Sequence, residues 1–145
     1  MPQASVEIRV PFSDVDSSGR IHFTAMFRYM DIAEHELVRS IGLPRATTFL
    51  DIAFPRVYVA CDFHRAIRYD DELTIEARVD RVGHSSWTVA FTARFTGEAR
   101  TEAQKHVHAA GEIAAEGHMT IVAMDPQTER ARRLPGDLRN ALAAD

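Results

Sequence analysis

The feature that most constrains the fold of this chain is a helical pattern that follows residue 23. Apolar residues recur there at steps of three or four positions, which is the period of an amphipathic helix. They are Met26, Met30, Ala33, Leu37 and Ile41. Charged residues are expected on the other faces, at Arg28, Asp31, Glu34 and Glu36. We expect one helix of about four turns. It has too many apolar positions to lie on a surface.

Both ends of this helix carry local signals. Thr24 is a suitable N-cap, because its hydroxyl oxygen accepts from a backbone N–H of the first turn. Gly42 and Pro44 stand where the apolar pattern stops, and these residue types end helices. The sequence therefore places the helix between Thr24 and Gly42.

Strand patterns lie before and after the helix. In residues 6–12, Val6, Ile8 and Val10 alternate with polar residues and a proline, which is the period of a strand with one wet face. Further strands are expected at 56–66, 72–82, 85–95 and about 111–124. Residues 46–54 and the Ala-rich tail are expected to be helical, and residues 98–107 to form an exposed loop.

The order of these elements predicts the architecture. One strand, a long helix and several antiparallel strands require a sheet that wraps around one central helix. We expect an α+β protein with the hotdog fold, in which a five-stranded antiparallel sheet surrounds the helix. A length of 145 residues with 46% apolar residues suits a single domain over residues 1–145. Its free sheet face or edge strand is available to a second subunit.

Charge and cysteine content exclude several classes of partner. A net charge of −4 gives no basic footprint for nucleic acid, although a few basic side chains suffice to bind one nucleotide. Cys61 is the single cysteine, which fits a reducing compartment. The N-terminus lacks the pattern of a signal peptide, and no apolar run approaches the length of a membrane span. We expect a soluble, cytoplasmic protein.

Chemistry is expected in the loop before the helix, residues 12–19, which gathers carboxylates and turn formers. Unpaired N–H groups at a helix start stabilise negative charge on a carbonyl oxygen. A carboxylate beside that point is a nucleophile or a base for water. The alternative is that Asp14 and Asp16 only cap a turn.

The pattern Asp14-x-Asp16-x-x-Gly19, with a strand before it and a long helix after it, resembles the 4-hydroxybenzoyl-CoA thioesterase branch of the hotdog superfamily. The resemblance spans most of the chain, from about residue 6 to about residue 138. Its further matches are Glu34, Leu37, Gly42-Leu43, Arg68-Tyr69-Asp70-Asp71-Glu72-Leu73, Gly83-His84-Ser85-Ser86 and Leu134-Pro135.

This resemblance implies the hydrolysis of an acyl-CoA or related acyl thioester, without a metal or redox cofactor. Asp16 falls on the catalytic carboxylate, which attacks the carbonyl carbon or activates a water molecule. Phe23 falls on the residue whose backbone N–H polarises the thioester carbonyl. CoA is expected along a subunit interface of a homo-oligomer, a dimer or a tetramer. The chain departs from the family at Phe12, Arg20, Met26 and Ala66, which are positions that shape the acyl pocket, so the acyl group stays open.

Other polar residues are weaker candidates for the site. His22 lies between Asp16 and the helix and is a candidate to orient the substrate, or an exposed loop residue. Ser85 and Ser86 are candidates to contact the nucleotide, or belong to a plain turn. Glu34 and His35 are either auxiliary groups of the site or members of a solvated or interface face.

Metal catalysis is not expected. His106, His108 and His118 come without a Cys-x-x-Cys or His-Glu-x-x-His motif. Two other functions stay open beside hydrolysis. One is a hotdog dehydratase or hydratase, which would pair His22 with Asp16. The other is a protein that binds an acyl thioester without cleaving it.

Overall fold

A computed structural model describes residues 1–43, 49–97 and 108–145. Its main elements are β1 (Gln3–Arg9), α1 (Phe23–Ser40), β2 (Arg56–Phe63), β3 (Glu72–Val82), β4 (Ser86–Phe95), β5 (Ile113–Val122) and α3 (Gly136–Ala143). Shorter elements are the 3-10 turn η1 (Phe12–Asp14) and the strands β6 (Met124–Asp125) and β7 (Arg130–Ala131). The expected loop at 98–107 lies outside the described residues. The described part of 46–54, residues 49–54, contains no helix.

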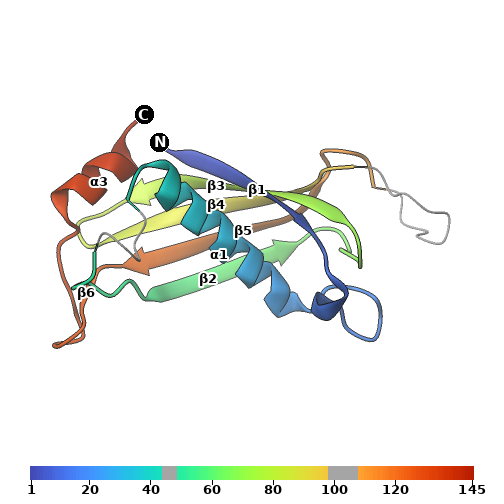
Figure 1. Ribbon diagram of the computed structural model, residues 1–145, viewed down its shortest axis with the longest axis horizontal. Coiled ribbons are helices and arrows are strands. Elements are labelled where there is room, and N and C mark those ends of the chain that lie inside the picture. Colours follow the sequence, from blue (N-terminus) through green and yellow to red (C-terminus); the bar gives the residue numbers. More distant parts are fainter. Residues whose placement is uncertain (44–48, 98–107) are drawn as a thin grey trace.

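The five long strands form one antiparallel sheet in the order β1-β3-β4-β5-β2. Helix α1 lies across one face of this sheet (Figure 1). Its apolar side meets the inner side chains of the strands, and together they form the hydrophobic core. The expected α+β architecture with one long helix is therefore confirmed.

Helix α1 differs from the expectation in three respects. It has 18 residues, which is about five turns instead of four. His22, and not Thr24, is the N-cap, because its side chain accepts from the Thr24 N–H. Glu34 is fully buried and does not lie on a polar face. The spacing of apolar residues along the helix predicts which positions face the core. It does not show that an ion pair can allow a carboxylate to take one of these positions.

The strand ends differ from the expectation where local turns intervene. β1 runs from Gln3 to Arg9 instead of 6–12, because η1 begins at Phe12. β2 stops at Phe63 instead of residue 66, because the N–H groups of His64 and Arg65 both donate to the Ala114 carbonyl. β3 matches the expected range, and α3 confirms the helical tail.

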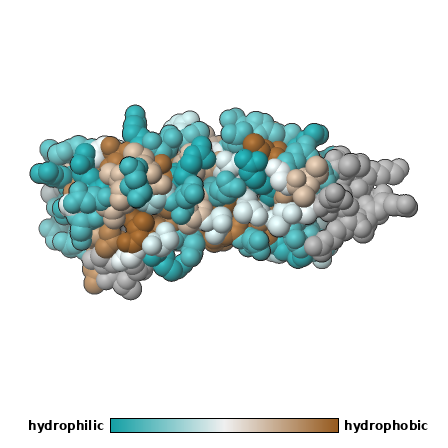
Figure 2. All heavy atoms as spheres, turned by 90° about the horizontal axis from the view of Figure 1, so that it is seen from above, coloured by the Kyte–Doolittle hydropathy of each residue, from teal (hydrophilic) through white to brown (hydrophobic). Residues whose placement is uncertain are grey.

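The surface is polar over β1 and less so over β2. In Figure 2, which looks down on the molecule of Figure 1, hydrophilic residues dominate and apolar residues appear as small separate patches. β2 is an edge strand of the sheet, and it exposes Val57, Tyr58 and Phe63 to 61%, 57% and 44%. Within the described residues, no helix is long and apolar enough to cross a membrane.

Candidate active site

The loop that carries Asp16 is a short hairpin ahead of α1. Val15 and Ile21 pair across it, and the Asp16 N–H donates to the Arg20 carbonyl over 2.9 Å. The Gly19 N–H closes the turn onto the Asp16 carbonyl over 3.0 Å. Gly19 has a φ of +80°, a conformation that glycine adopts without steric cost. This turn presents the Asp16 side chain to solvent.

The Asp16 carboxylate uses one oxygen to hold the turn. Its Oδ1 accepts from the Ser18 N–H over 2.8 Å and from the Ser18 hydroxyl over 2.5 Å. These hydrogen bonds lower the pKa of Asp16 below its usual value, so the group is ionised at neutral pH. Among the described residues, Oδ2 accepts no hydrogen bond. Asp16 therefore caps a turn and still offers one carboxylate oxygen for chemistry.

Asp14, two residues earlier, has a different environment. It is buried, and its carboxylate accepts from Arg28 over 2.5 Å and from the Tyr29 hydroxyl over 2.8 Å. The Arg28 hydrogen bond lowers the pKa of Asp14, while burial and the Asp14 contact raise the pKa of Tyr29. The Asp14 carbonyl also accepts from the His22 N–H over 2.8 Å. Asp14 therefore anchors the loop to α1.

The first turn of α1 has a free backbone donor. A ring nitrogen of His22 accepts from the Thr24 N–H over 3.4 Å and lies 2.7 Å from the Thr24 hydroxyl. In the described part of the chain, the Phe23 N–H donates to no acceptor. It lies at the positive end of the helix, as expected for a group that polarises a carbonyl. The Phe23 ring is exposed and stacks on His22 at 4.8 Å.

A pocket of about 320 Å³ opens beside Phe23. Residues from two segments line it: Arg20, Ile21, Phe23, Phe63, His64, Arg65, Ala66 and Ile67. The Ile21 N–H donates to the Ile67 carbonyl over 2.9 Å, which brings the segment after β2 against the loop. Sequence spacing did not indicate Phe63, His64 or Arg65, since only this pairing places them near Phe23. Asp16 is close in sequence to Arg20 and Ile21, which line this pocket, but Asp16 itself does not line it.

Two of the residues that line the pocket, His64 and Arg65, have carboxylate partners on the β5 side. His64 Nε2 lies 3.2 Å from Glu116, and Arg65 pairs with Glu112 over 2.5 Å. The Glu112 pKa is lowered, chiefly by the Ala109 N–H that it accepts. These pairs hold the end of β2 against β5. Cys61, further back on β2, has a pKa raised to about 11 by burial, so it is a neutral thiol and not a nucleophile.

Ser85 and Ser86 lie far from Asp16 within this chain. β3 pairs with β4 from Leu73 opposite Phe95 to Val82 opposite Trp87. Ser85 lies in the turn that connects these strands and Ser86 begins β4, both at the Val82 end of β3. The Asp16 loop contacts the other end, where the Tyr69 N–H donates to the Gly19 carbonyl. An 11-residue strand spans roughly 35 Å. One protomer therefore does not bring the two sets of residues together.

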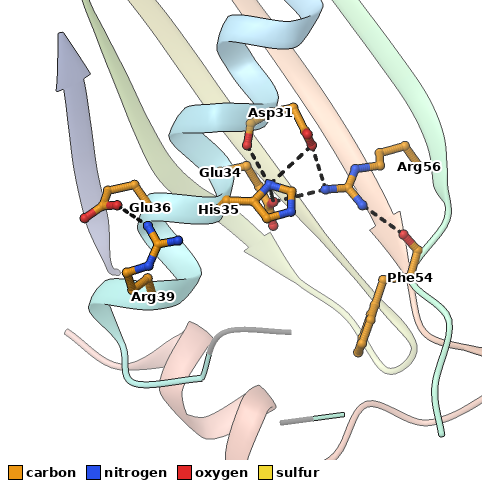
Figure 3. A network of polar contacts seen from close by, with 7 residues as sticks. All are labelled: Asp31, Glu34, His35, Glu36, Arg39, Phe54 and Arg56. Carbon is orange, nitrogen blue, oxygen red and sulfur yellow. Dashed lines mark hydrogen bonds and ion pairs between the residues drawn. The ribbon is translucent and has the colours of Figure 1, made fainter. Parts of the chain in front are cut away.

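Glu34 and His35 belong to a polar network on the middle of α1 (Figure 3). Arg56, at the start of β2, donates to Asp31 over 2.8 Å and to Glu34 over 3.1 Å. His35 Nδ1 lies 3.4 Å from Glu34 and 3.5 Å from Asp31. Glu34 is about 16 Å along the helix from Phe23. In this chain the network lies away from the Asp16 loop.

Asp31, Glu34 and His35 are also the described residues whose ligand atoms cluster within 4.8 Å. Arg56 already supplies positive charge to both carboxylates, so we assign no metal to them. Of the other histidines considered, His106 lies outside the described residues. His108 is buried and stacks on Phe95 at 3.7 Å.

Comparison with known proteins identifies the family. Residues 18–101, more than half of the chain, match the family model described as "Thioesterase superfamily". The chain belongs to the thioesterase superfamily. The match begins two residues after Asp16, so it does not include that residue. The expected resemblance and the enzyme class, a thioester hydrolase, are confirmed.

A related thioesterase has a named substrate. The 1,4-dihydroxy-2-naphthoyl-CoA hydrolase of Prochlorococcus marinus (strain MIT 9313) is 30% identical over 144 residues, which cover 93% of this chain and 86% of the relative.

Solved thioesterase structures share the fold. The 1,4-dihydroxy-2-naphthoyl-CoA thioesterase from Synechocystis has a TM-score of 0.80 at 16% identity and covers 97% of this chain and 95% of its own. A variant of 4-hydroxybenzoyl CoA thioesterase, complexed with 4-hydroxybenzoyl CoA, has a TM-score of 0.79 at 20% identity. The match covers 99% of this chain and 100% of that protein. The expected hotdog fold is confirmed.

Proposed function

We propose that this thioesterase hydrolyses an acyl-CoA thioester with Asp16 as the catalytic carboxylate and the Phe23 N–H as the donor to the carbonyl oxygen. The observation that carries the proposal is the free N–H of Phe23 at the start of α1, beside a pocket and next to the Asp16 hairpin. The lowered pKa of Asp16 supports the role, because the carboxylate is in its reactive, ionised form.

The reaction balances without a metal or redox cofactor. A water molecule activated by Asp16, or the Asp16 carboxylate itself, forms a bond to the carbonyl carbon. The carbonyl oxygen becomes an oxyanion, which the Phe23 N–H and the helix dipole stabilise. The carbonyl then re-forms, the C–S bond breaks, and its electron pair leaves with the CoA sulfur. The sulfur takes up the proton that Asp16 removed from the water, or a proton from solvent if Asp16 is the nucleophile. If Asp16 is the nucleophile, water hydrolyses the acyl anhydride in a second step.

The substrate proposed here is an aromatic acyl-CoA. The support is the relative that shares 30% identity and is a hydrolase of 1,4-dihydroxy-2-naphthoyl-CoA. The pocket at Phe23 adds aromatic and aliphatic side chains, including those of Phe23, Phe63 and Ile67. Apolar pockets discriminate weakly between similar shapes, so a set of acyl groups is needed to rank them.

We also propose that the working form is a homo-oligomer built on β2. β2 is an edge strand with exposed apolar side chains, and such strands pair with another chain. Antiparallel pairing of two β2 strands about a two-fold axis turns the second sheet end for end. The Ser85-Ser86 hairpin of one copy then lies at the same end of the joint sheet as Asp16 of the other, where CoA would bridge them.

The protein is proposed to act in the cytoplasm, with no nucleic acid or membrane as partner. The single cysteine fits a reducing compartment, and the net charge of −4 gives no footprint for nucleic acid.

Thiol release from a set of acyl-CoAs tests the proposed function. The purified protein is offered acetyl-, crotonyl-, benzoyl- and 2-naphthoyl-CoA, and free CoA is followed with a thiol reagent. We expect thiol release, fastest with an aryl group. Tight binding without thiol release would identify a binding protein instead. Loss of enoyl absorbance from crotonyl-CoA without thiol release would identify a hydratase.

A further inference from the structure

Two arginines, Arg20 and Arg68, lie opposite each other where the Asp16 hairpin meets the segment after β2. The backbone hydrogen bonds of this bridge are made by the residues on either side: the Tyr69 N–H donates to Gly19 and the Ile21 N–H to Ile67. In an antiparallel ladder, residues flanked in this way form the closer kind of pair, with Cα atoms roughly 4.5 Å apart and side chains on one face. The two arginine side chains therefore leave the backbone as direct neighbours.

Neither of these guanidinium groups forms an ion pair within the described part of the chain. Asp71 accepts from the backbone N–H of Arg68 over 2.8 Å and does not pair with its side chain. The Arg68 Nη1 atom is buried and has no hydrogen-bond partner. Like charges opposite each other in a ladder are destabilising, and a buried donor without an acceptor adds to the cost. The arrangement therefore favours the binding of an anion.

Arg20 also lies beside the groups that the proposed reaction uses. It lines the pocket at Phe23, and its carbonyl accepts from the Asp16 N–H over 2.9 Å. The Asp16 pKa is lowered chiefly by Ser18 and, more weakly, by the charge of Arg20. His64 and Arg65 line the same pocket, but each is paired with a glutamate. An anion bound by Arg20 thus belongs to the part of the substrate that lies near the thioester.

The position of the pair narrows the chemistry of this anion. Guanidinium groups bind the oxygens of carboxylates and phosphates through paired hydrogen bonds. An acyl-CoA carries phosphates on its nucleotide, but the long, uncharged pantetheine arm separates them from the thioester. The acyl group itself carries an oxyanion when it derives from a dicarboxylic acid. Because Arg20 lies beside Asp16 and Phe23, the acyl group is the favoured source.

We infer that Arg20 and Arg68 bind a carboxylate carried by the acyl group, so that the enzyme prefers thioesters of dicarboxylic acids, in which one carboxyl group stays free. The inference rests on the proposed function and deepens it, since it adds an acidic substituent to the acyl group. The bound carboxylate offsets the repulsion between two guanidinium groups that the backbone holds together.

The test is the ratio of kcat/KM for an acidic substrate to that for an uncharged one of similar size. One pair is 4-carboxybenzoyl-CoA and 4-methylbenzoyl-CoA, and a flexible pair is glutaryl-CoA and valeryl-CoA. We expect the unmodified protein to favour the acid in one or both pairs. Arg20→Gln should lower that ratio by about tenfold or more, because a hydrogen bond between charged groups is lost. Arg20→Lys keeps the charge but not the planar group, so its ratio should lie between the two.

Arg39→Gln is the matched control. Arg39 is an exposed arginine in the last turn of α1, pairs with Glu36 and does not line the pocket. Its ratios should equal those of the unmodified protein. Arg20→Gln should also keep or raise the free energy of unfolding, because it removes one of two like charges. Unchanged ratios in Arg20→Gln would overturn the inference, and a fall in its unfolding free energy beside them would assign Arg20 a structural role.

Binding without turnover separates the inference from the proposed function. The 4-carboxybenzyl and 4-methylbenzyl thioethers of CoA, which cannot be hydrolysed, are compared with CoA by calorimetry. Tighter binding of the acid, lost in Arg20→Gln, would support the inference even if no acyl-CoA releases thiol, a result that contradicts the proposed function alone. If Arg20→Gln weakens both thioethers and CoA by the same factor, the pair binds a CoA phosphate and the inference is wrong.

Discussion

Asp14 and Asp16 stand two positions apart and have unlike roles in the structure. Asp14 is buried against Arg28 and Tyr29, while Asp16 is exposed in a turn closed by Ser18. Spacing alone shows two carboxylates in a loop and does not separate them. The difference arises because the helix brings Arg28 and Tyr29, which are 14 and 15 residues away in the chain, onto Asp14 only.

Asp14→Asn should destabilise the fold. The variant keeps the shape but loses the ion pair with Arg28, so we expect the free energy of unfolding to fall by about 2 kcal/mol at pH 7. The folded state lowers the Asp14 pKa. The stabilisation is therefore present above the usual pKa of an aspartate and is lost as the pH falls through the folded value. Urea unfolding at pH 7 and near pH 3 measures this. A deficit of equal size at both pH values would contradict the assignment.

The two residue-level errors in α1 have different causes. Thr24 was the expected N-cap, but the His22 ring accepts the bond, since imidazole nitrogen is also an acceptor. Glu34 was expected on a polar face, but its carboxylate is buried beside Arg56. The partner comes from β2, and the local pattern of α1 carries no information about it. Phe23 and Asp16, by contrast, lie where the sequence placed them, beside the helix start.

At the scale of elements, the Arg56 network joins α1 to the edge strand β2. Arg56 contacts Asp31 and Glu34 on the helix and the Phe54 carbonyl before the strand (Figure 3). These contacts fasten the first residue of β2 to the middle of α1. They hold an edge strand that pairs, among the described residues, with β5 alone.

Arg56→Met should remove this attachment at high cost. Loss of one partner of a buried ion pair costs about 3–5 kcal/mol, because the remaining charge stays buried. Adding Glu34→Gln to Arg56→Met should recover part of the loss, since the buried charge is then also gone. Urea unfolding of the two single variants and the double variant gives the coupling energy. Strictly additive losses would show that the pair does not act as a unit.

The sequence predicted the kinds of elements better than their ends. Strands with clear alternation, such as β3, match their expected range. β1 ends before the predicted residue because the 3-10 turn η1 follows it, and β2 ends early because two N–H groups share the Ala114 carbonyl. The spacing of apolar residues does not predict such turns.

At the scale of the whole molecule, the two groups of predicted site residues lie at opposite ends of the sheet. Asp16 lies at one end of β3 and the Ser85-Ser86 hairpin follows the other. The sequence showed both groups but not their separation, which depends on the register of the strands. In the proposed homo-oligomer, a second copy paired along β2 brings the two groups together.

Val59→Lys should disrupt that assembly. Val59 lies near the middle of β2, so in the proposed pairing a lysine on each strand brings like charges close together, and edge lysines prevent strand pairing. We expect the sedimentation mass to fall towards that of one chain, with a loss of turnover. Ser5→Lys on β1, the opposite edge strand, is the control and should change neither. A monomeric Val59→Lys variant with full activity would show that one chain contains the whole site.

The central claim is that Asp16 performs the chemistry. The measurement that tests it most directly is kcat/KM of Asp16→Asn for an aryl-CoA, taken beside the unfolding free energy and beside Asp14→Asn. We expect Asp16→Asn to lose about a thousandfold in kcat/KM or more, since a positioned carboxylate contributes 10²–10⁴-fold, with stability changed little. Asp14→Asn should show the reverse pattern. Activity of Asp16→Asn within about threefold of the unmodified protein would contradict the account.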